Sequence, residues 1–183
     1  MIRRMANYIL PAMLVLVTAL PASGATPADE PPPLRTEFAF EARVKVDRPM
    51  VLGQSSHGLR RIVPILGGSV SGPALKGSVI AGGADWQSVR PDGAWELQAR
   101  YTIQTDDGVL IMVENRGVRY ARSEVLERLA KGEKVDRADV YCRTVATFEA
   151  PRDSKYEWMN RTLIIADVER TPDVAIVRFY KVH

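Results

Sequence analysis

The sequence predicts an all-β fold, an eight-stranded antiparallel up-and-down barrel with one short helix between strands five and six. Three observations support this fold class. Runs of residues alternate between apolar and polar, short turns containing Gly, Pro or Asp separate most of the runs, and a single segment has good helical periodicity. Closing into a barrel removes exposed strand edges, and about eight strands enclose either a filled centre or one small ligand. A two-sheet sandwich is the alternative.

The first strand is expected to begin at about Arg35, where an apolar row alternates with mostly charged residues. Such alternation means that one face is buried and the other is in water. The apolar row consists of Phe38, Phe40, Ala42, Val44 and Val46. Seven further strands are expected near residues 59–70, 74–82, 95–105, 109–116, 139–149, 161–169 and 173–183.

Turn and helix signals join these strands. The segment Asp106-Asp107-Gly108 predicts a hairpin turn, because an Asp-Gly pair accepts positive φ at little cost. One helix is expected from about Ser123 to Lys131, with Ser123 as its cap and Gly132 ending it. A shorter helical turn is expected within 154–160.

The N-terminal residues are not expected to belong to the barrel. Two arginines, an apolar run from Tyr8 to Leu20 and small residues up to Ala25 form the pattern of a secretory signal peptide. We therefore expect a signal peptide over 1–25, a proline-rich tether over 26–34 and the barrel domain over 35–183. A retained membrane anchor is the alternative. The expected location is periplasmic or extracellular.

Composition limits the partners. Removing residues 1–25 takes away two of the 25 basic residues and none of the 22 acidic ones, so the remaining chain is nearly neutral. We expect no nucleic-acid partner, because such proteins hold phosphates with an excess of basic side chains. We also expect no membrane association after signal removal, since a charged row on the first strand and 7% aromatic residues argue against an outer-membrane barrel.

Several chemistries are not expected. The histidines are His57 and the terminal His183, and no spaced histidine–cysteine–carboxylate cluster is present, so we expect no metal site. The absence of alternating strands and helices excludes a dinucleotide fold, and no cofactor is expected. The one cysteine, Cys142, cannot form an internal disulfide and is expected to be a small buried side chain.

A series of motifs extends through the expected barrel. In order they are Ser56–Ile65 (SHGLRRIVPI), Gly72–Gly77 (GPALKG), Gly82–Trp86 (GGADW), Arg90–Gly93 (RPDG), Thr105–Gly108 (TDDG), Tyr141–Thr144 (YCRT) and Tyr156–Asn160 (YEWMN). The series resembles the domain-of-unknown-function 3237 family of small bacterial and fungal proteins, over about Arg35 to His183. The resemblance implies an antiparallel barrel with a pocket and no settled general activity. Cys142 departs from the aromatic or larger apolar residue expected at its position.

Three residues are candidates for catalysis. Asp85 follows two glycines that allow an unusual backbone path, and its carboxyl group is expected to transfer protons or to cap a turn. Tyr101 lies on the apolar face of its strand, so its hydroxyl points inward and needs a partner. Alternation places Arg143 outside, whereas the motif suggests an inward arginine that binds an oxyanion. These two directions stay open.

Five residues are candidates for ligand binding. Arg61 lies in the second strand, Trp86 follows Asp85, and Asn115 lies near a strand end at the expected barrel mouth. Trp158 and Asn160 lie on the segment before strand seven and are expected to form a lid, with packing of Trp158 on the barrel end as the alternative.

These features favour a barrel that binds a small, partly apolar cyclic or aromatic molecule. Acid–base catalysis would make it an isomerase, a lyase or a lactone hydrolase, and the alternative is a carrier or sensor without turnover. Both faces of the strand near 109–116 are apolar. This predicts either burial under the helix or a homodimer contact.

Overall fold

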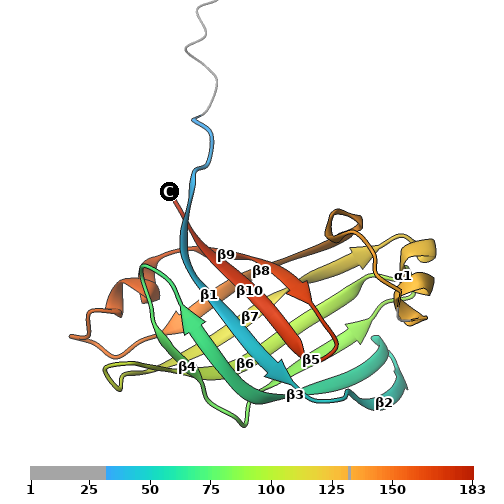
Figure 1. Ribbon diagram of the computed structural model, residues 1–183, viewed down its shortest axis with the longest axis horizontal. Helices are drawn as coiled ribbons and strands as arrows, with labels where there is room; N and C mark the ends of the chain where they lie inside the picture. Colours follow the sequence, from blue (N-terminus) through green and yellow to red (C-terminus); the bar gives the residue numbers. More distant parts are fainter. Residues whose placement is uncertain (1–31, 132) are drawn as a thin grey trace, which may run out of the picture. The chain divides into compact units, whose positions relative to one another are not determined.

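The computed structural model describes residues 32–131 and 133–183, of which Leu34–His183 form one compact unit. The expected signal peptide, most of the tether and the expected helix end at Gly132 lie outside the described residues. In the described part, ten strands make up the sheet (Figure 1). They are β1 Thr36–Val46, β2 Met50–Ser55, β3 Gly58–Ser71, β4 Gly77–Val79, β5 Ala84–Val89, β6 Trp95–Thr105, β7 Leu110–Ala121, β8 Val140–Glu149, β9 Ile164–Arg170 and β10 Val174–Val182.

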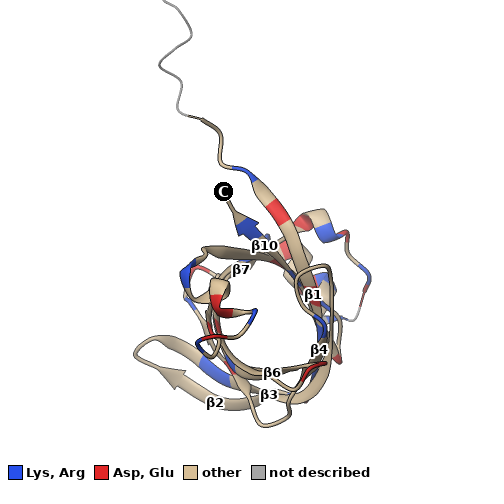
Figure 2. Ribbon diagram, turned by 90° about the vertical axis from the view of Figure 1, so that its left-hand side faces the viewer, with Lys and Arg blue, Asp and Glu red and all other residues tan. Residues whose placement is uncertain are grey.

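The sheet closes into an eight-membered antiparallel barrel. Consecutive strands from β6 to β10 pair with one another, β10 pairs with β1, and β1 pairs with β3 to complete the ring. Strands β4 and β5 share one position between β3 and β6, and β2 pairs with β3 alone. Figure 2 shows the ring nearly end-on, with β2 outside it. The predicted fold class is therefore confirmed.

Two strand predictions were wrong in detail. The sequence did not predict β2, because Met50, Val51 and Leu52 are consecutive apolar residues without alternation, and all three are exposed. Only the short β4 lies within the strand expected at 74–82, and β5, which follows it, was not predicted. Asp85 consequently lies within a strand and not on a turn.

Gly82 and Gly83 explain the break between β4 and β5. Gly82 has a φ of 108°, which favours glycine. A Cβ atom on Gly83 would lie 2.4 Å from the carbonyl oxygen of Arg100 and 2.8 Å from the Cβ of Tyr101. The two glycines therefore let the chain cross closely over β6 before β5 begins.

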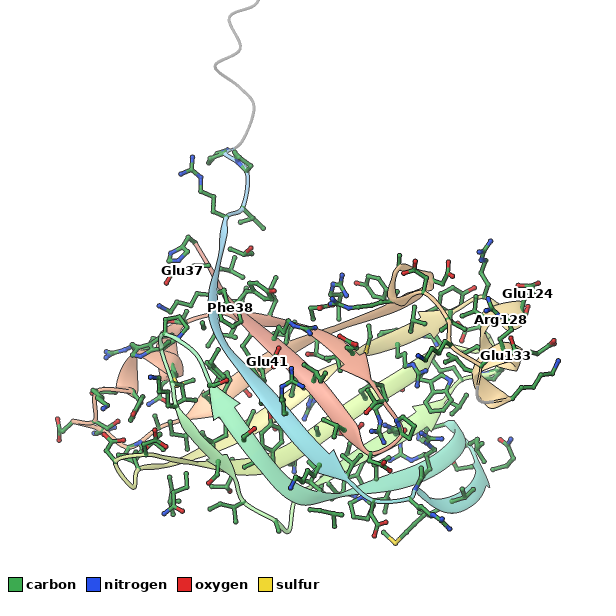
Figure 3. The ribbon with its side chains drawn as sticks, viewed as in Figure 1. Glu37, Phe38, Glu41, Glu124, Arg128 and Glu133 are labelled. Atoms are coloured by element: carbon green, nitrogen blue, oxygen red, sulfur yellow. The ribbon has the colours of Figure 1, made fainter. Side chains whose placement is uncertain are left out.

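The helix α1, Ser123–Ala130, follows β7 and precedes β8, in the predicted place. Its N-cap is Arg122, which makes no side-chain cap, so the expected cap by Ser123 was wrong. Figure 3 shows its charged residues Glu124 and Arg128 at one end of the barrel. Short 3-10 turns form at Arg137–Asp139 (η2) and Glu157–Arg161 (η3). None of the described helices is long and apolar enough to cross a membrane.

The outer row of β7 is not buried under α1. Leu110 and Met112 are 51% and 46% exposed. One of the two predicted explanations for the apolar faces of this strand was therefore wrong, and the homodimer contact stays a prediction.

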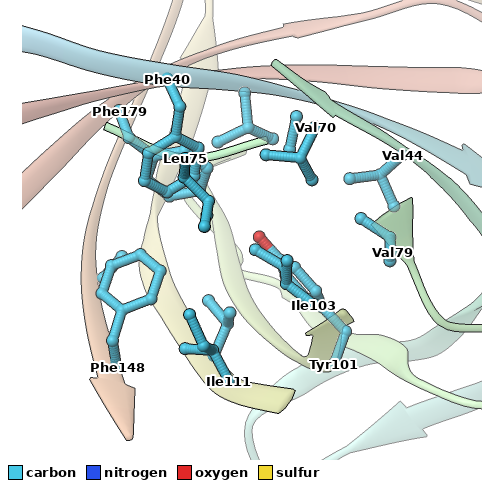
Figure 4. Packing of buried hydrophobic residues seen from close by; sticks show 14 of the residues in the cluster. Phe40, Val44, Val70, Leu75, Val79, Tyr101, Ile103, Ile111, Phe148 and Phe179 are labelled. Carbon is cyan, nitrogen blue, oxygen red and sulfur yellow. The ribbon is translucent and has the colours of Figure 1, made fainter. Parts of the chain in front are cut away.

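An apolar core fills one end of the barrel. Phe40 stacks on Phe179 with ring centroids 4.6 Å apart, and Phe148 meets both rings edge-on. Figure 4 shows these rings near Ile111 and Leu75, with the hydroxyl of Tyr101 pointing into the barrel interior. We call this core of Phe40, Phe148 and Phe179 the apolar plug. Because it fills one end of the barrel, a ligand site can form only toward the other end.

Candidate functional site

A cavity of about 80 Å³ lies inside the barrel, on the side of the apolar plug where β3 begins and β7 ends. Nine apolar residues from β1, β3, β6, β9 and β10 line half of its wall. Nine polar or ionisable residues line it as well: Arg61, Asp85, Gln87, Tyr101, Asn115, Arg119, Cys142, Thr144 and Arg170.

Strand register arranges these residues by depth. Arg61 pairs with Gln87 and, two residues further in, Val63 pairs with Asp85. On the other side, Trp95 pairs with Arg119, and deeper in the barrel Ala99 pairs with Asn115. Successive inward-facing residues on one strand are two residues, or about 7 Å, apart. Asp85 therefore lies about 7 Å deeper in the barrel than Arg61, measured along the strands. The arginines therefore line the mouth, with the carboxyl group below them.

Asp85 is held by two hydrogen bonds. Its Oδ1 accepts the backbone N–H of Gln98 at 3.0 Å, and its Oδ2 accepts the side-chain amide of Gln87 at 2.5 Å. The Oε1 of Gln87 in turn accepts the Nε–H of Arg61 at 2.6 Å. Burial raises the pKa of Asp85 above its usual value of 3.8, against these hydrogen bonds and the charges of Arg61 and Arg170, which lower it.

Three arginines gather at the mouth. The guanidinium carbons of Arg61 and Arg119 lie 4.1 and 5.3 Å from the ring centroid of Trp95, within the range of cation–π contacts. Desolvation, followed by the charges of Arg119 and Arg170, lowers the pKa of Arg61 to about 10. Desolvation likewise lowers the pKa values of Arg119 and Arg170. The arginines stay protonated at neutral pH, at an electrostatic cost.

Four buried side-chain atoms lack a hydrogen-bond partner in the described part of the chain, and all four belong to residues that line this cavity. They are Tyr101 Oη, Asn115 Oδ1, Arg119 Nε and Thr144 Oγ1. A buried polar group without a partner costs about 1–3 kcal/mol. These four atoms are available to hydrogen-bond the polar groups of a bound molecule.

Cys142 is buried in the same wall. Burial raises the pKa of its thiol to about 11, while the charge of Arg119 lowers it. A thiol in this state is a weak nucleophile, so the structure favours the predicted packing role.

The family model for "Protein of unknown function (DUF3237)" matches residues 34–182. The chain belongs to this family. A UPF0311 protein of Clostridium acetobutylicum is 42% identical over 147 residues, which cover 80% of this chain and 92% of that protein. The crystal structure of a conserved protein of unknown function from Rhodopseudomonas palustris has a TM-score of 0.77 at 36% identity, covering 84% of this chain and all of the other.

A further relative has a named activity. The hydroalkoxylation enzyme of Penicillium herquei is 31% identical over 115 residues, covering 62% of this chain and 72% of that enzyme.

Four predicted site residues of this DUF3237 chain lie together in the cavity wall: Asp85, Tyr101, Arg61 and Asn115. Arg143 does not. Its side chain is 51% exposed and its Nη1 lies 2.5 Å from Asp167 on the outer surface. Of the two directions left open, alternation was therefore correct, and Arg143 cannot bind a ligand in the cavity. Trp86 alternates with Asp85 and Gln87, so it too faces outward and does not line the cavity.

The two residues expected to form a lid belong to η3. Trp158 is partly buried against the core, and the Nζ of Lys181 lies 4.7 Å from the centroid of its ring. Asn160 bonds both backbone groups of Ala150, at 2.7 Å to the N–H and 2.9 Å to the carbonyl. They do not line the cavity, and packing on the barrel was the correct alternative for Trp158.

Sequence reasoning missed five cavity or rim residues: Gln87, Trp95, Arg119, Thr144 and Arg170. Strand alternation could have found most of them. Arg119 is four residues after Asn115 on β7, and Arg170 is two residues after Val168 on β9, so both lie on inward-facing rows.

Proposed function

We propose that this barrel is an acid–base enzyme that acts on a small molecule, with Asp85 as the group that transfers the proton. One observation carries this proposal: a partly buried carboxyl of raised pKa lines the same cavity as four unpartnered polar atoms. A general acid or base works best when its pKa moves toward the working pH, and perturbed carboxyl groups in cavities are characteristic of active sites.

The surrounding residues support such chemistry. Gln87 and the backbone of Gln98 fix both oxygens of Asp85, so the carboxyl group has a defined orientation. Burial raises the pKa of Tyr101 above its usual value of 10.0, which keeps its hydroxyl neutral and able to donate. A neutral donor in the same cavity as the acid–base group can stabilise negative charge that develops on a substrate oxygen.

The Penicillium herquei relative suggests the class of reaction. Hydroalkoxylation adds an alcohol across a carbon–carbon double bond: the hydroxyl oxygen bonds one carbon, the other carbon takes a proton, and the hydroxyl proton leaves to a base. Only protons and electron pairs move, with an oxygen pair forming the C–O bond and the π pair forming the C–H bond, so acid–base groups are sufficient. We propose an addition or elimination of this kind for the present chain, with Asp85 delivering or accepting the proton.

The test is proton exchange at carbon. The purified barrel is incubated in D₂O with a panel of unsaturated alcohols and phenols, each with and without a carboxylate group, and deuterium incorporation is followed by mass spectrometry. We expect deuterium at a former alkene carbon in at least one compound, with Asp85→Asn reducing the rate by about 100-fold or more. Arg143→Gln, a change on the outer surface, is the matched control and should retain the rate.

A carrier or sensor is the second candidate, favoured by the same unpartnered polar atoms. It predicts a small molecule that co-purifies in native mass spectrometry and no conversion of any panel compound. If Asp85→Asn converts a panel compound at the same rate as the parent, Asp85 is not the group that transfers the proton.

We also propose that the protein works outside the cytoplasm, on the basis of the signal peptide expected over 1–25. Osmotic shock should release it from cells without detergent. Sedimentation with the membrane fraction would contradict this location.

A further inference from the structure

The three arginines at the mouth differ from those on the outside of the barrel. Outer arginines such as Arg100 and Arg143 form ion pairs with acidic neighbours, Glu114 and Asp167 respectively. By contrast, no described acidic side chain lies within 4.0 Å of the guanidinium nitrogens of the three mouth arginines. These are Arg61, Arg119 and Arg170.

The cavity therefore carries an excess of positive charge. Asp85 is the one acidic residue among those that line it, against three arginines, and Cys142 stays neutral because burial raises the pKa of its thiol to about 11. Desolvation, followed by repulsion from Arg119, lowers the pKa of Arg170, while the charges of Asp85 and Asp173 raise it. Like charges in a partly desolvated site are costly unless an anion accompanies them.

The polar contacts of the arginines leave most of their donors free for a ligand. Arg61 donates its Nε–H to Gln87, and Arg170 donates from Nη1 to the carbonyl of Thr171. The Nε of Arg119 is buried and has no partner among the described residues. Guanidinium groups match carboxylates with two parallel N–H···O bonds, which makes arginine the preferred residue for carboxylate recognition.

We propose that the mouth is a carboxylate clamp formed by Arg61, Arg119 and Arg170, and that the substrate is a small carboxylic acid bound as its anion. The clamp deepens the proposed function, because it would hold the carboxylate at the mouth while the next atoms of the substrate reach Asp85. Along the strands, Arg61 and Asp85 are about 7 Å apart, a distance that a few bonded carbon atoms span.

The size and polarity of the cavity fit such a molecule. At about 80 Å³ it is smaller than the roughly 150 Å³ cavity that accommodates benzene, so it takes a short carbon skeleton or one end of a larger one. Apolar residues such as Val44, Val63 and Val177 would contact that skeleton. Tyr101 and Asn115, which are each 5% exposed, would supply hydrogen bonds at the inner end.

The experiment compares carboxylates with their neutral amides. Acetate, butyrate, crotonate and benzoate, and the four matching amides, are titrated into the protein by isothermal calorimetry at low ionic strength. We expect at least one carboxylate to bind about 10-fold to 100-fold more tightly than its amide. Arg119→Gln and Arg170→Gln should each abolish that preference, whereas Arg143→Gln on the exterior should preserve it.

Folding of the variants is checked by thermal unfolding without ligand. Relief of like-charge repulsion should leave Arg119→Gln and Arg170→Gln at least as stable as the parent. Equal affinities for each acid and its amide, no binding of any carboxylate below about 10 mM, or an equal loss on Arg143→Gln would each overturn the clamp.

The Asp85→Asn variant separates the clamp from the proposed catalysis. It removes the negative charge beneath the mouth, so carboxylates should bind at least as tightly as to the parent. If carboxylates bind but the parent catalyses no deuterium exchange, the proposed enzyme activity is wrong and the carboxylate clamp is supported. If the parent catalyses exchange but does not prefer carboxylates over amides, the clamp is wrong and the enzyme activity is supported.

Discussion

Removing the hydroxyl of Tyr101 is expected to stabilise the protein, which is unusual for a buried tyrosine. Its side chain is 5% exposed, and its oxygen has no partner among the described residues. Leaving a buried hydroxyl unpaired costs about 1–3 kcal/mol, and Tyr101→Phe removes that cost while keeping the ring. We therefore expect a gain of about 1 kcal/mol, or roughly 2–4 °C in Tm for a domain of this size.

Tyr156 provides the matched control. It is also 5% exposed, but its hydroxyl donates to the Oδ1 of Asp107 at 2.9 Å. Tyr156→Phe loses a hydrogen bond to a charged group and should cost about 1.5–3 kcal/mol. The two substitutions, identical in chemistry, should thus change stability in opposite directions.

The assay is urea unfolding of the parent and both variants at pH 7, followed by tryptophan fluorescence. The midpoint should rise for Tyr101→Phe and fall for Tyr156→Phe, with similar m-values. A loss of more than about 1 kcal/mol for Tyr101→Phe would mean that its hydroxyl is bonded within the fold and does not await a ligand.

Three further predictions concern the cavity and the barrel wall. Burial raises the pKa of Asp85, so ionising this carboxyl group destabilises the folded parent protein. As the pH rises from about 3.5 to 7, the stability of Asp85→Asn should therefore increase relative to that of the parent. Thermal unfolding of both proteins across this pH range tests the sign. Iodoacetamide at pH 8 should alkylate Cys142 about 100-fold more slowly in the folded than in the unfolded protein, since burial raises its pKa to about 11. Gly117→Ala should cost about 3 kcal/mol or more in urea unfolding, because the new Cβ would lie 2.1 Å from the carbonyl oxygen of Arg143.

The barrel could be predicted because its signal is local. Alternation along each strand, turns such as Asp106-Asp107-Gly108 and one amphipathic segment specify most elements without knowledge of their partners. The β2 strand was not predicted, because its exposed apolar residues do not alternate with polar ones. The break between β4 and β5 was not predicted either. It depends on the close approach of Gly83 to Tyr101, which is a contact between strands that the local sequence does not show.

The site could be predicted only in part, for a related reason. Asp85 and Tyr101 were found from motif and alternation, and strand register brings them into one wall. Arg119 and Arg170 obey the same alternation, but an arginine near a strand end is usually solvated. That they converge on one cavity depends on pairing between strands distant in sequence, and no single strand contains this information.

The central claim is that the polar end of the barrel holds a small molecule between the arginine mouth and Tyr101. A crystal structure of residues 34–183 soaked with the tightest-binding carboxylate tests it directly. We expect density for the anion against Arg119 and Arg170, with its other end within hydrogen-bond reach of Asp85 or Tyr101. A cavity closed by side chains, or an anion bound only on the outer surface, would contradict the account.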